Sequence, residues 1–574
     1  MISEFNRVLS FLTFKYKLLF YLISLLIFIA GLMEVVGLSL IIPIASIVFD
    51  NKLSDNNLFH NFIFFFNIET VNNLEVKKVF LIVILIFFLL KFIYVGYVYY
   101  IQTIFLRKVQ VYFGKKIYNY YINLSLKNFY KKKSSELIRN LTTEIVNYIN
   151  LLRCTFGIIS ETLILILILI FLFYINFKVS IFIFVIFYFF FYFFKLLNKS
   201  QFAYYSSQKS HLESLIIKNL QSIFGLFKEI KIQKKFFYFY NEYLKYLNIF
   251  SKIYNNQYFI LQYPKLLLEF ISATILIATL SYLLISTIDL KDLITLISIY
   301  IFSAFRAIPS ISRIANYYSD FKFHSSSINI INKEFKKNKF LSNLFENNIL
   351  FNFKKIRITN LHFSYNKKNK LLNNISFDIK KGDKVCITGQ SGSGKTTLVN
   401  IILGLLNPTA GSIFIDNFNL KKILHKWQKI IGYVPQNIFL LDETIKKNVA
   451  FAINNKEFNK STFDSVIKKT QLNKLIKSLR YKENTNVGEI GNKLSGGQLQ
   501  RIGIARALYF NPKVLILDES TNSLDVNTEK KILKSLLTYT KDMTILFVTH
   551  RNHNIKYFNK LIRINNGNVF VTSR

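Results

Sequence analysis

The chain has 574 residues, of which 52% are apolar and 17% aromatic, and its formal net charge is +42 at pH 7. This apolar content favours a membrane protein of several domains over a soluble one. The only cysteines, Cys154 and Cys386, have no motif partner, which excludes a disulfide framework, a zinc site and a redox pair. The basic residues are spread along the chain without an RNA- or DNA-binding motif, so we interpret the charge as a lysine-rich background and expect no nucleic-acid partner.

Six apolar runs in the first part of the chain approach or exceed the ~20 residues that a helix needs to cross a bilayer. The first is far longer than the apolar core of a cleavable signal, so we expect it to be retained. Only residues 175–178 separate the third and fourth runs, which predicts a tight turn. The predicted spans are, in chain order, about 18–49, 79–105, 151–174, 179–194, 259–285 and 293–314.

Basic residues gather in two long loops, between the second and third spans and between the fourth and fifth. The positive-inside rule places these loops and both termini in the cytoplasm. The loops contain little Gly or Pro, so spans two to five are expected to continue as helices well beyond the bilayer. Their tips, near Leu126–Ser135 and Phe224–Glu229, are predicted to form short helices that touch the C-terminal domain.

Several spans contain ionisable residues, which are costly inside a membrane and therefore informative about function. Arg306 and Arg313 lie seven residues apart in the sixth span and hence on one helix face. Together with Lys91 and Lys265, they predict a water-filled cavity whose basic lining binds an anionic cargo. The alternative is structural: Lys265 pairs with Glu269, and Lys91 extends its ammonium toward the membrane surface.

Residues 331–352 are polar and charged, and we expect them to link a membrane domain over 1–330 to a second domain over 353–574. The second domain reads as short strands, turns and helices, the pattern of an α/β fold. Near its start, Tyr365 follows an alternating strand, Ile356 to Phe363. An aromatic ring at the end of such a strand is suited to stack on a nucleotide base.

A glycine-rich loop follows an apolar strand and precedes an apolar helical run. Phosphate-binding loops occupy this position, because glycines let backbone N–H groups turn toward phosphate oxygens and the helix dipole adds positive charge. Lys395 is expected to reach the β- and γ-phosphates of a nucleoside triphosphate, and the Thr396 hydroxyl to bind Mg²⁺. The nucleotide-binding residues predicted in this loop are Gly389, Gln390, Ser391, Gly392, Ser393, Gly394, Lys395, Thr396 and Thr397.

Two acids end a later apolar strand, Val514 to Leu517. Asp518 and Glu519 therefore lie at the carboxyl end of a buried parallel strand, where α/β sheets bind ligands. Asp518 is suited to hold the Mg²⁺ shell, and Glu519 to orient or deprotonate the attacking water. Gln436, in a loop, is expected to sense Mg²⁺ and this water. His550 ends another strand, and its imidazole would donate to the γ-phosphate.

A second phosphate-binding corner precedes another helical run. Its predicted residues are Ser495, Gly496, Gly497 and Gln498. One γ-phosphate held between two such corners suggests two chains that meet head to tail around ATP.

The order of these motifs resembles that of the ATP-binding cassette transporters. The Walker A, Q-loop, signature, Walker B, D-loop and switch-histidine positions of that family correspond here to Gly389–Thr396, Gln436, Leu494–Gln498, Asp518-Glu519, Ser523–Asp525 and His550. Six spans ahead of one cassette are similar to the half-transporters of the exporter class.

The resemblance implies an α-helical membrane domain, with six transmembrane helices and long cytoplasmic extensions, fused to an α/β P-loop nucleotide-binding domain. It also implies ATP hydrolysis coupled to transport, with ATP and Mg²⁺ as cofactors. The implied partner is a second copy of the chain. In such a homodimer each ATP site uses Lys395 of one chain and Ser495 of the other.

Within the exporter class, Glu34–Pro43 and Phe305–Ile314 look like segments of the bacterial flippases that move lipid-linked oligosaccharides for protein N-glycosylation. This resemblance implies a polyprenyl-diphosphate-linked oligosaccharide as cargo at the inner (cytoplasmic) membrane, its pyrophosphate bound by Arg306, Arg313 and the two lysines. The alternative is an exporter of lipid A-like lipids, peptides or drugs. The six spans argue against a soluble cassette protein that acts on nucleic acid or ribosomes.

Overall fold

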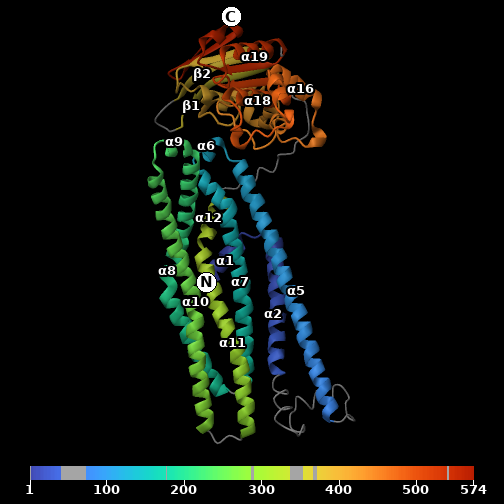
Figure 1. Ribbon diagram of the computed structural model, residues 1–574, viewed down its shortest axis with the longest axis vertical. Helices are drawn as coiled ribbons and strands as arrows, with labels where there is room; N and C mark the ends of the chain where they lie inside the picture. Colours follow the sequence, from blue (N-terminus) through green and yellow to red (C-terminus); the bar gives the residue numbers. More distant parts are fainter. Residues whose placement is uncertain are drawn as a thin grey trace. The chain divides into compact units, whose positions relative to one another are not determined.

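The structure is a computed structural model. It describes residues 2–40, 73–175, 177–285, 290–336, 353–365, 371–539 and 542–573. The chain divides into two units, Met1–Leu124 with Phe129–Lys339 and Ser125–Asn128 with Phe340–Arg574. The first unit is helical and the second is α/β (Figure 1).

Helices build the first unit, and several of them are long. They are α1 (Ile2–Ser10), α2 (Phe14–Ser39), α5 (Asn73–Ile122), α7 (Ser134–Ile175), α8 (Phe177–Gly225), α10 (Phe236–Ile285), α11 (Leu290–His324) and α12 (Ser326–Lys336). α5 and α10 have 50 residues each. Since an α-helix rises 1.5 Å per residue, each is about 75 Å long, more than twice the ~30 Å hydrocarbon core of a bilayer. Helices that extend well beyond the length of a bilayer span are therefore confirmed.

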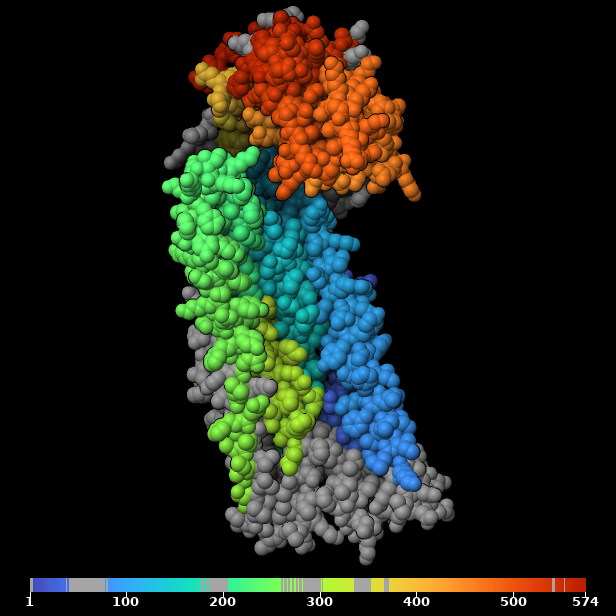
Figure 2. Space-filling view, in the orientation of Figure 1, coloured from blue at the N-terminus to red at the C-terminus, as the bar shows by residue number. Residues whose placement is uncertain are grey.

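Three segments within the searched residues are long and apolar enough to cross a membrane: Phe14–Gly37, Leu81–Ile122 and Ser134–Ile175. Large apolar side chains on α5 are exposed, for example Leu85 at 65% and Phe92 at 78%. Figure 2 shows this helix, coloured blue, open along much of its length on one face. Such a surface suits contact with lipid tails.

The other three predicted spans fall on α8, α10 and α11, where many side chains lie outside the described residues. The predicted end of the first span, near residue 49, also lies outside them. α7 ends at Ile175 and α8 begins at Phe177, so the connection between them is as short as predicted, and the turn residue itself lies outside the described part. The two predicted tips carry the short helices α6 (Leu126–Phe129) and α9 (Phe227–Ile232).

Aromatic rings pack the part of the first unit where α1, α2, α5 and α7 meet. The rings of Phe20 and Phe156 stack with centroids 4.6 Å apart, and those of Phe113 and Tyr148 are also 4.6 Å apart. All four side chains are almost fully buried. The Tyr148 hydroxyl donates to the carbonyl of Val8 at 2.7 Å, so the buried polar tip is satisfied.

A buried ion pair within α7 is hydrogen-bonded to Ser210 of α8. Glu144 is fully buried, and its Oε1 lies 3.3 Å from Nε of Arg139. The Ser210 hydroxyl donates to the same oxygen at 3.0 Å, and Arg139 donates to the Ser210 carbonyl. Loss of either charged partner would leave the other buried and uncompensated.

Two sheets form the second unit. The first is antiparallel, in the order β2 (Leu372–Lys380), β1 (Lys355–Phe363), β4 (Ala410–Ile415) and β5 (Phe418–Asn419). The second has the order β10 (Asn568–Ser573), β9 (Lys560–Asn565), β3 (Lys384–Gly389), β8 (Thr544–Val548), β7 (Val514–Asp518) and β6 (Ile431–Val434). Within it β9, β3, β8, β7 and β6 run parallel. Every residue of β7 and β8 is buried, as expected for central parallel strands.

Seven α-helices accompany the sheets in the described part of the second unit, from residue 353 on. They are α13 (Lys395–Ile402), α14 (Leu424–Lys429), α15 (Ile445–Val449), α16 (Lys460–Lys469), α17 (Asn473–Ser478), α18 (Gly496–Tyr509) and α19 (Val526–Tyr539). The predicted strand–loop–helix order around the glycine-rich loop is confirmed as β3, residues 390–394 and α13. α12 continues to Lys336, inside the predicted linker, and residues 337–352 lie outside the described part.

Candidate active site

The loop between β3 and α13 has a backbone that requires glycine. Gly392 and Gly394 have φ angles of 79° and 102°, in the left-handed region that strains residues with a Cβ. A Cβ at Gly394 would lie 2.7 Å from Cδ2 of Leu372. At Gly389 a Cβ would lie 2.4 Å from the carbonyl oxygen of Ile564, in the neighbouring strand β9. Glycine therefore lets the loop adopt these backbone angles and pack closely against its neighbours, without side chains that would cover its N–H groups.

Lys395 begins α13 and turns its ammonium into the loop. Its Nζ donates to the carbonyl oxygens of Gly389 at 3.1 Å and Gln390 at 2.9 Å. Burial lowers the pKa of Lys395, an effect that Glu519 and Asp518 oppose. A bound anion would favour the charged ammonium.

The loop also retains unused hydrogen-bonding capacity. Within the described residues, the buried Oγ of Ser393 has no hydrogen-bond partner. A buried hydroxyl without a partner costs free energy unless a ligand or water binds it. The open backbone, the ammonium of Lys395 and this hydroxyl fit the phosphates of ATP.

Asp518 ends β7, where it is 1% exposed. Burial, followed by the charge of Glu519, raises the pKa of Asp518 to about 6, although Thr396, Lys395 and Tyr433 lower it. Its Oδ1 has no hydrogen-bond partner among the described residues. A divalent cation would stabilise the charged carboxylate. Asp518 and Thr396 therefore fit the Mg²⁺ of a bound nucleotide.

Glu519 lies in strained backbone and contacts three donors. Its φ of 49° belongs to the left-handed region, which costs a non-glycine residue roughly 1–3 kcal/mol. Its Oε1 is 2.7 Å from Nε2 of His550. Its Oε2 accepts hydrogen bonds from Gln436 at 2.9 Å and Asn522 at 3.3 Å. Strain and convergent donors on a carboxylate that is 11% exposed are typical of a functional group.

The structure thus brings Glu519, Gln436 and His550 together, although the three lie far apart in the sequence. A carboxylate at this position is able to orient a water molecule and accept its proton during attack on a phosphate. Mg²⁺, when bound, would neutralise part of the phosphate charge. Gln436 contacts Glu519 directly, and its predicted role toward Mg²⁺ stays a prediction.

Tyr365 follows β1, and its ring is 47% exposed. The ring packs edge-on against Phe363, with centroids 4.9 Å apart at 90°. Its hydroxyl lies 3.4 Å from Oγ1 of Thr397, in the first turn of α13. An exposed aromatic face is therefore held beside the phosphate loop, where the sequence predicts stacking on adenine.

Substitution of Tyr365 by Ala is expected to weaken ATP binding about tenfold, because base stacking contributes ~1–3 kcal/mol and 1.4 kcal/mol corresponds to a factor of ten. Tyr365→Phe keeps the ring and is the matched control, expected to bind like the wild type. Titration with a fluorescent ATP analogue measures both dissociation constants. Equal affinities for all three proteins would exclude stacking by this residue.

The second phosphate-binding corner is preformed at the start of α18. Ser495 is its N-cap: its Oγ accepts from the N–H of Gln498 at 3.4 Å, and its own N–H donates to Oε1 of Gln498 at 3.0 Å. This capping box leaves Ser495 and Gly496 exposed. The corner is therefore open to a phosphate from outside the chain, and its use by a second copy stays a prediction.

Acids pair with three of the four cations predicted to bind cargo. Nζ of Lys91 lies 2.8 Å from Oε2 of Glu34, and Nη2 of Arg306 lies 3.1 Å from Oε1 of the same carboxylate. Nε of Arg313 lies 2.8 Å from Oε1 of Glu161. Lys91 thus has a partner that sequence reasoning did not assign. Glu34 connects α2 with α5 and α11, and Glu161 connects α7 with α11.

These pairs leave positive charge in excess among the described side chains. Lys91 and Arg306 share one carboxylate, so one cation of this triad is not compensated. The Arg313 side chain is 42% exposed. Within the described residues its buried Nη2 has no hydrogen-bond partner. The side chain of Lys265, the fourth predicted cation, lies outside the described part of the structure.

Comparison with known proteins identifies the second unit. Residues 372–522 match the family described as ABC transporter. The mitochondrial iron-sulfur clusters transporter of Danio rerio is 38% identical over 218 residues, which cover 37% of this chain and 29% of that protein. An ATP-dependent lipid A-core flippase of Francisella tularensis is 35% identical over 215 residues, 37% of this chain and 35% of that protein. The matches thus span only about a third of these relatives.

A solved structure matches over both units. It is a bacterial Atm1-family ABC exporter with ATP bound, and the two structures superpose with a TM-score of 0.76. The match covers 96% of this chain and 94% of the exporter chain. The sequence identity is 17%, so this likeness concerns the fold. It confirms a helical membrane-type domain joined to an α/β nucleotide-binding domain. Residues 372–522 form an ABC transporter domain, and the chain has the fold of an ABC exporter.

Proposed function

We propose that two copies of this chain hydrolyse ATP to move a lipid-linked anionic substrate across the cytoplasmic membrane. The cargo we infer is a polyprenyl-diphosphate-linked oligosaccharide. The observation that carries the cargo class is the excess of positive charge on α5 and α11, at Lys91, Arg306 and Arg313. The ABC domain and both termini would lie in the cytoplasm, where ATP is present.

The ATP site supports the energy source. Lys395 would bind the β- and γ-phosphates, Asp518 and Thr396 would hold Mg²⁺, and Glu519 would act on the attacking water with His550 beside it. The exposed corner at Ser495 would complete the site of the second copy. ATP binding would then close the two nucleotide-binding domains on each other, and hydrolysis would let them reopen.

The cations in the apolar helices support an anionic headgroup. Buried or half-buried charges are tolerated only when they are paired, and the Arg306 and Lys91 cations share Glu34. A pyrophosphate carries more negative charge than one carboxylate, and guanidinium groups bind phosphate oxygens bidentately. It would therefore compete with Glu34 for both cations and loosen the contact that joins α2, α5 and α11.

A second candidate cargo is a lipid A-like lipid. Several relatives of the ABC domain are named ATP-dependent lipid A-core flippases. Phosphates on such a lipid would meet the same cations. A neutral drug would leave the excess charge without a partner, which makes this cargo less favourable.

Stimulation of ATP hydrolysis distinguishes these cargoes. The purified chain in lipid nanodiscs is supplied with a polyprenyl-diphosphate-linked oligosaccharide, with the same glycolipid carrying an uncharged linker, with lipid A, or with a neutral amphipathic drug. We expect the diphosphate-linked lipid to raise the ATPase rate and the uncharged analogue to leave it unchanged. Stimulation by lipid A alone would favour the second candidate, and stimulation only by neutral compounds would overturn the anionic cargo.

A further inference from the structure

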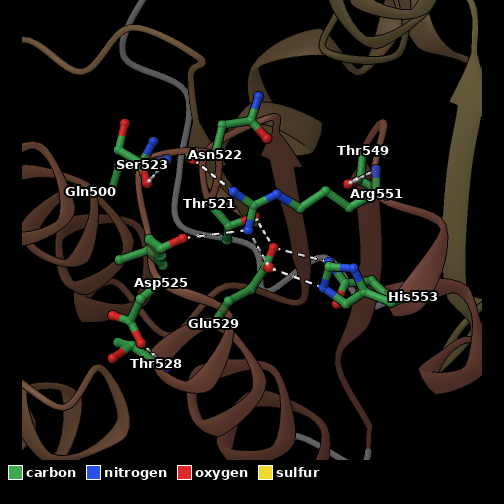
Figure 3. A network of polar contacts seen from close by, with 12 residues as sticks. Gln500, Thr521, Asn522, Ser523, Asp525, Thr528, Glu529, Thr549, Arg551 and His553 are labelled. Atoms are coloured by element: carbon green, nitrogen blue, oxygen red, sulfur yellow. Dashed lines mark hydrogen bonds and ion pairs between the residues drawn. The ribbon is translucent and has the colours of Figure 1, made fainter.

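Glu529 is a fully buried carboxylate in the first turn of α19, outside the residues that sequence motifs assign to the ATP site. In the chain, Glu529 comes shortly after the loop that carries Glu519. The side chains that contact Glu529 come from two loops (Figure 3). A buried charge of this kind is expensive unless every oxygen is paired. The partners of Glu529 therefore indicate what it holds in place.

Four side chains satisfy this carboxylate. Thr521 Oγ1 and Asn554 Nδ2 donate to its Oε1 at 2.7 Å and 2.9 Å. Arg551 Nη1 lies 2.7 Å from its Oε2, and Nε2 of His553 lies 3.4 Å from the same oxygen. Thr521 follows Glu519 closely in the chain, whereas the other three follow His550. Glu529 thus connects the two loops that carry the catalytic carboxylate and its histidine.

Arg551 strengthens this connection with its remaining donors. Its Nη2 donates to the carbonyl of Asn522 at 2.8 Å, and its Nη1 also reaches the carbonyl of Leu524 at 3.4 Å. Arg551 directly follows His550, so one guanidinium joins the backbone beside His550 to the loop after Glu519. Rotation of either loop would break several of these charge-assisted bonds together.

The loop after Glu519 also contacts the signature corner. The N–H of Ser523 donates to Oε1 of Gln500, on α18, at 3.0 Å. A Cβ placed on Gly496 would lie 3.3 Å from Cβ of Ser523, so the corner and this loop pack closely. Movement at the corner would therefore be transmitted to a loop that Arg551 and Glu529 tie to His550.

We propose that Glu529 and Arg551 are positioning residues for ATP hydrolysis. Their ion pair fixes the position of one loop relative to the other. It thereby maintains the 2.7 Å contact between Glu519 and His550. Both residues contact the two loops, through which they would act on the catalytic pair. The inference rests on the ATPase activity in the proposed function, and is independent of the cargo.

The test compares kcat and KM for ATP in the full-length chain in nanodiscs. Glu529→Gln keeps the shape of the side chain and removes its charge. We expect kcat to fall about tenfold or more, the usual effect of losing such a supporting contact, with KM and ATP binding unchanged. In a His550→Ala background the same change should have no further effect on kcat, because the contact it maintains is already lost.

Glu144→Gln is the matched control, since Glu144 is also fully buried and paired with an arginine, in the first unit. Glu144→Gln should lower the thermal unfolding midpoint about as much as Glu529→Gln does. It should leave kcat unchanged. Three results would overturn the inference: an unchanged kcat in Glu529→Gln, an equal further loss in the His550→Ala background, or the same kcat loss in Glu144→Gln. A wild-type chain without ATPase activity would overturn the proposed function and this inference with it.

Discussion

Replacement of Glu519 by Gln is expected to lower the ATP hydrolysis rate about 10²- to 10⁴-fold, the range for a positioned general base. The amide keeps the size of the side chain but is unable to take a proton from water. ATP binding should persist, because the phosphate loop, Lys395 and Tyr365 are unchanged. Phosphate release by the purified chain measures the rate, and a fluorescent ATP analogue measures binding.

Two further variants show whether the loss of hydrolysis in Glu519→Gln is specific to the catalytic step. Lys395→Ala should lose both turnover and tight ATP binding, because the ammonium inside the phosphate loop is removed. Glu483→Gln is the control: Glu483 pairs with Lys460 at 2.8 Å and is not among the predicted ATP-site residues. Its hydrolysis rate should equal that of the wild type. Undiminished hydrolysis by Glu519→Gln would remove Glu519 from the mechanism.

The double substitution Arg306→Ala with Arg313→Ala is expected to stop transport of a pyrophosphate-linked glycolipid while basal ATP hydrolysis survives. Both guanidinium groups that would bind the pyrophosphate are lost, whereas the ABC domain is untouched. Removal of Arg313 also leaves the buried Glu161 carboxylate without its partner, which is expected to destabilise the fold. Thermal unfolding must therefore be measured alongside flipping in liposomes.

Two controls separate lost binding from lost stability. Arg313→Gln combined with Glu161→Gln removes the pair without leaving a buried charge, and should also impair flipping. Glu34→Gln leaves Lys91 and Arg306 in place without their shared carboxylate, so anionic lipid should bind at least as well. Full flipping by the double arginine variant, or loss of flipping only in variants that unfold, would contradict the basic binding site.

Sequence patterns predicted those parts of the fold that depend on residues close together in the chain. The strand, the glycine loop and the helix around Lys395 follow from apolar runs and glycine spacing. Asp518 and Glu519 lie at the end of a buried strand because an apolar run ends there. The long helices follow from the near absence of Gly and Pro in the basic loops.

Partners that are distant in sequence were not predictable in the same way. Glu529 reads as an ordinary acid in the first turn of a helix, and only the folded chain shows it buried against Arg551. The shared use of Glu34 by Lys91 and Arg306 likewise depends on how three helices pack. The left-handed backbone of Glu519 has no signal in residue type, because glycine or asparagine is the usual choice at positive φ.

The most direct test of the central claim is ATP-driven movement of a fluorescent polyprenyl-diphosphate-linked oligosaccharide in liposomes that contain the chain. A membrane-impermeant reagent quenches the label in the outer leaflet, so it reports how much lipid has changed sides. We expect ATP and Mg²⁺ to change the quenched fraction with the wild type, and to have no effect with Glu519→Gln. An equal quenched fraction with and without ATP, in a preparation that hydrolyses ATP, would contradict the proposed transport of this lipid.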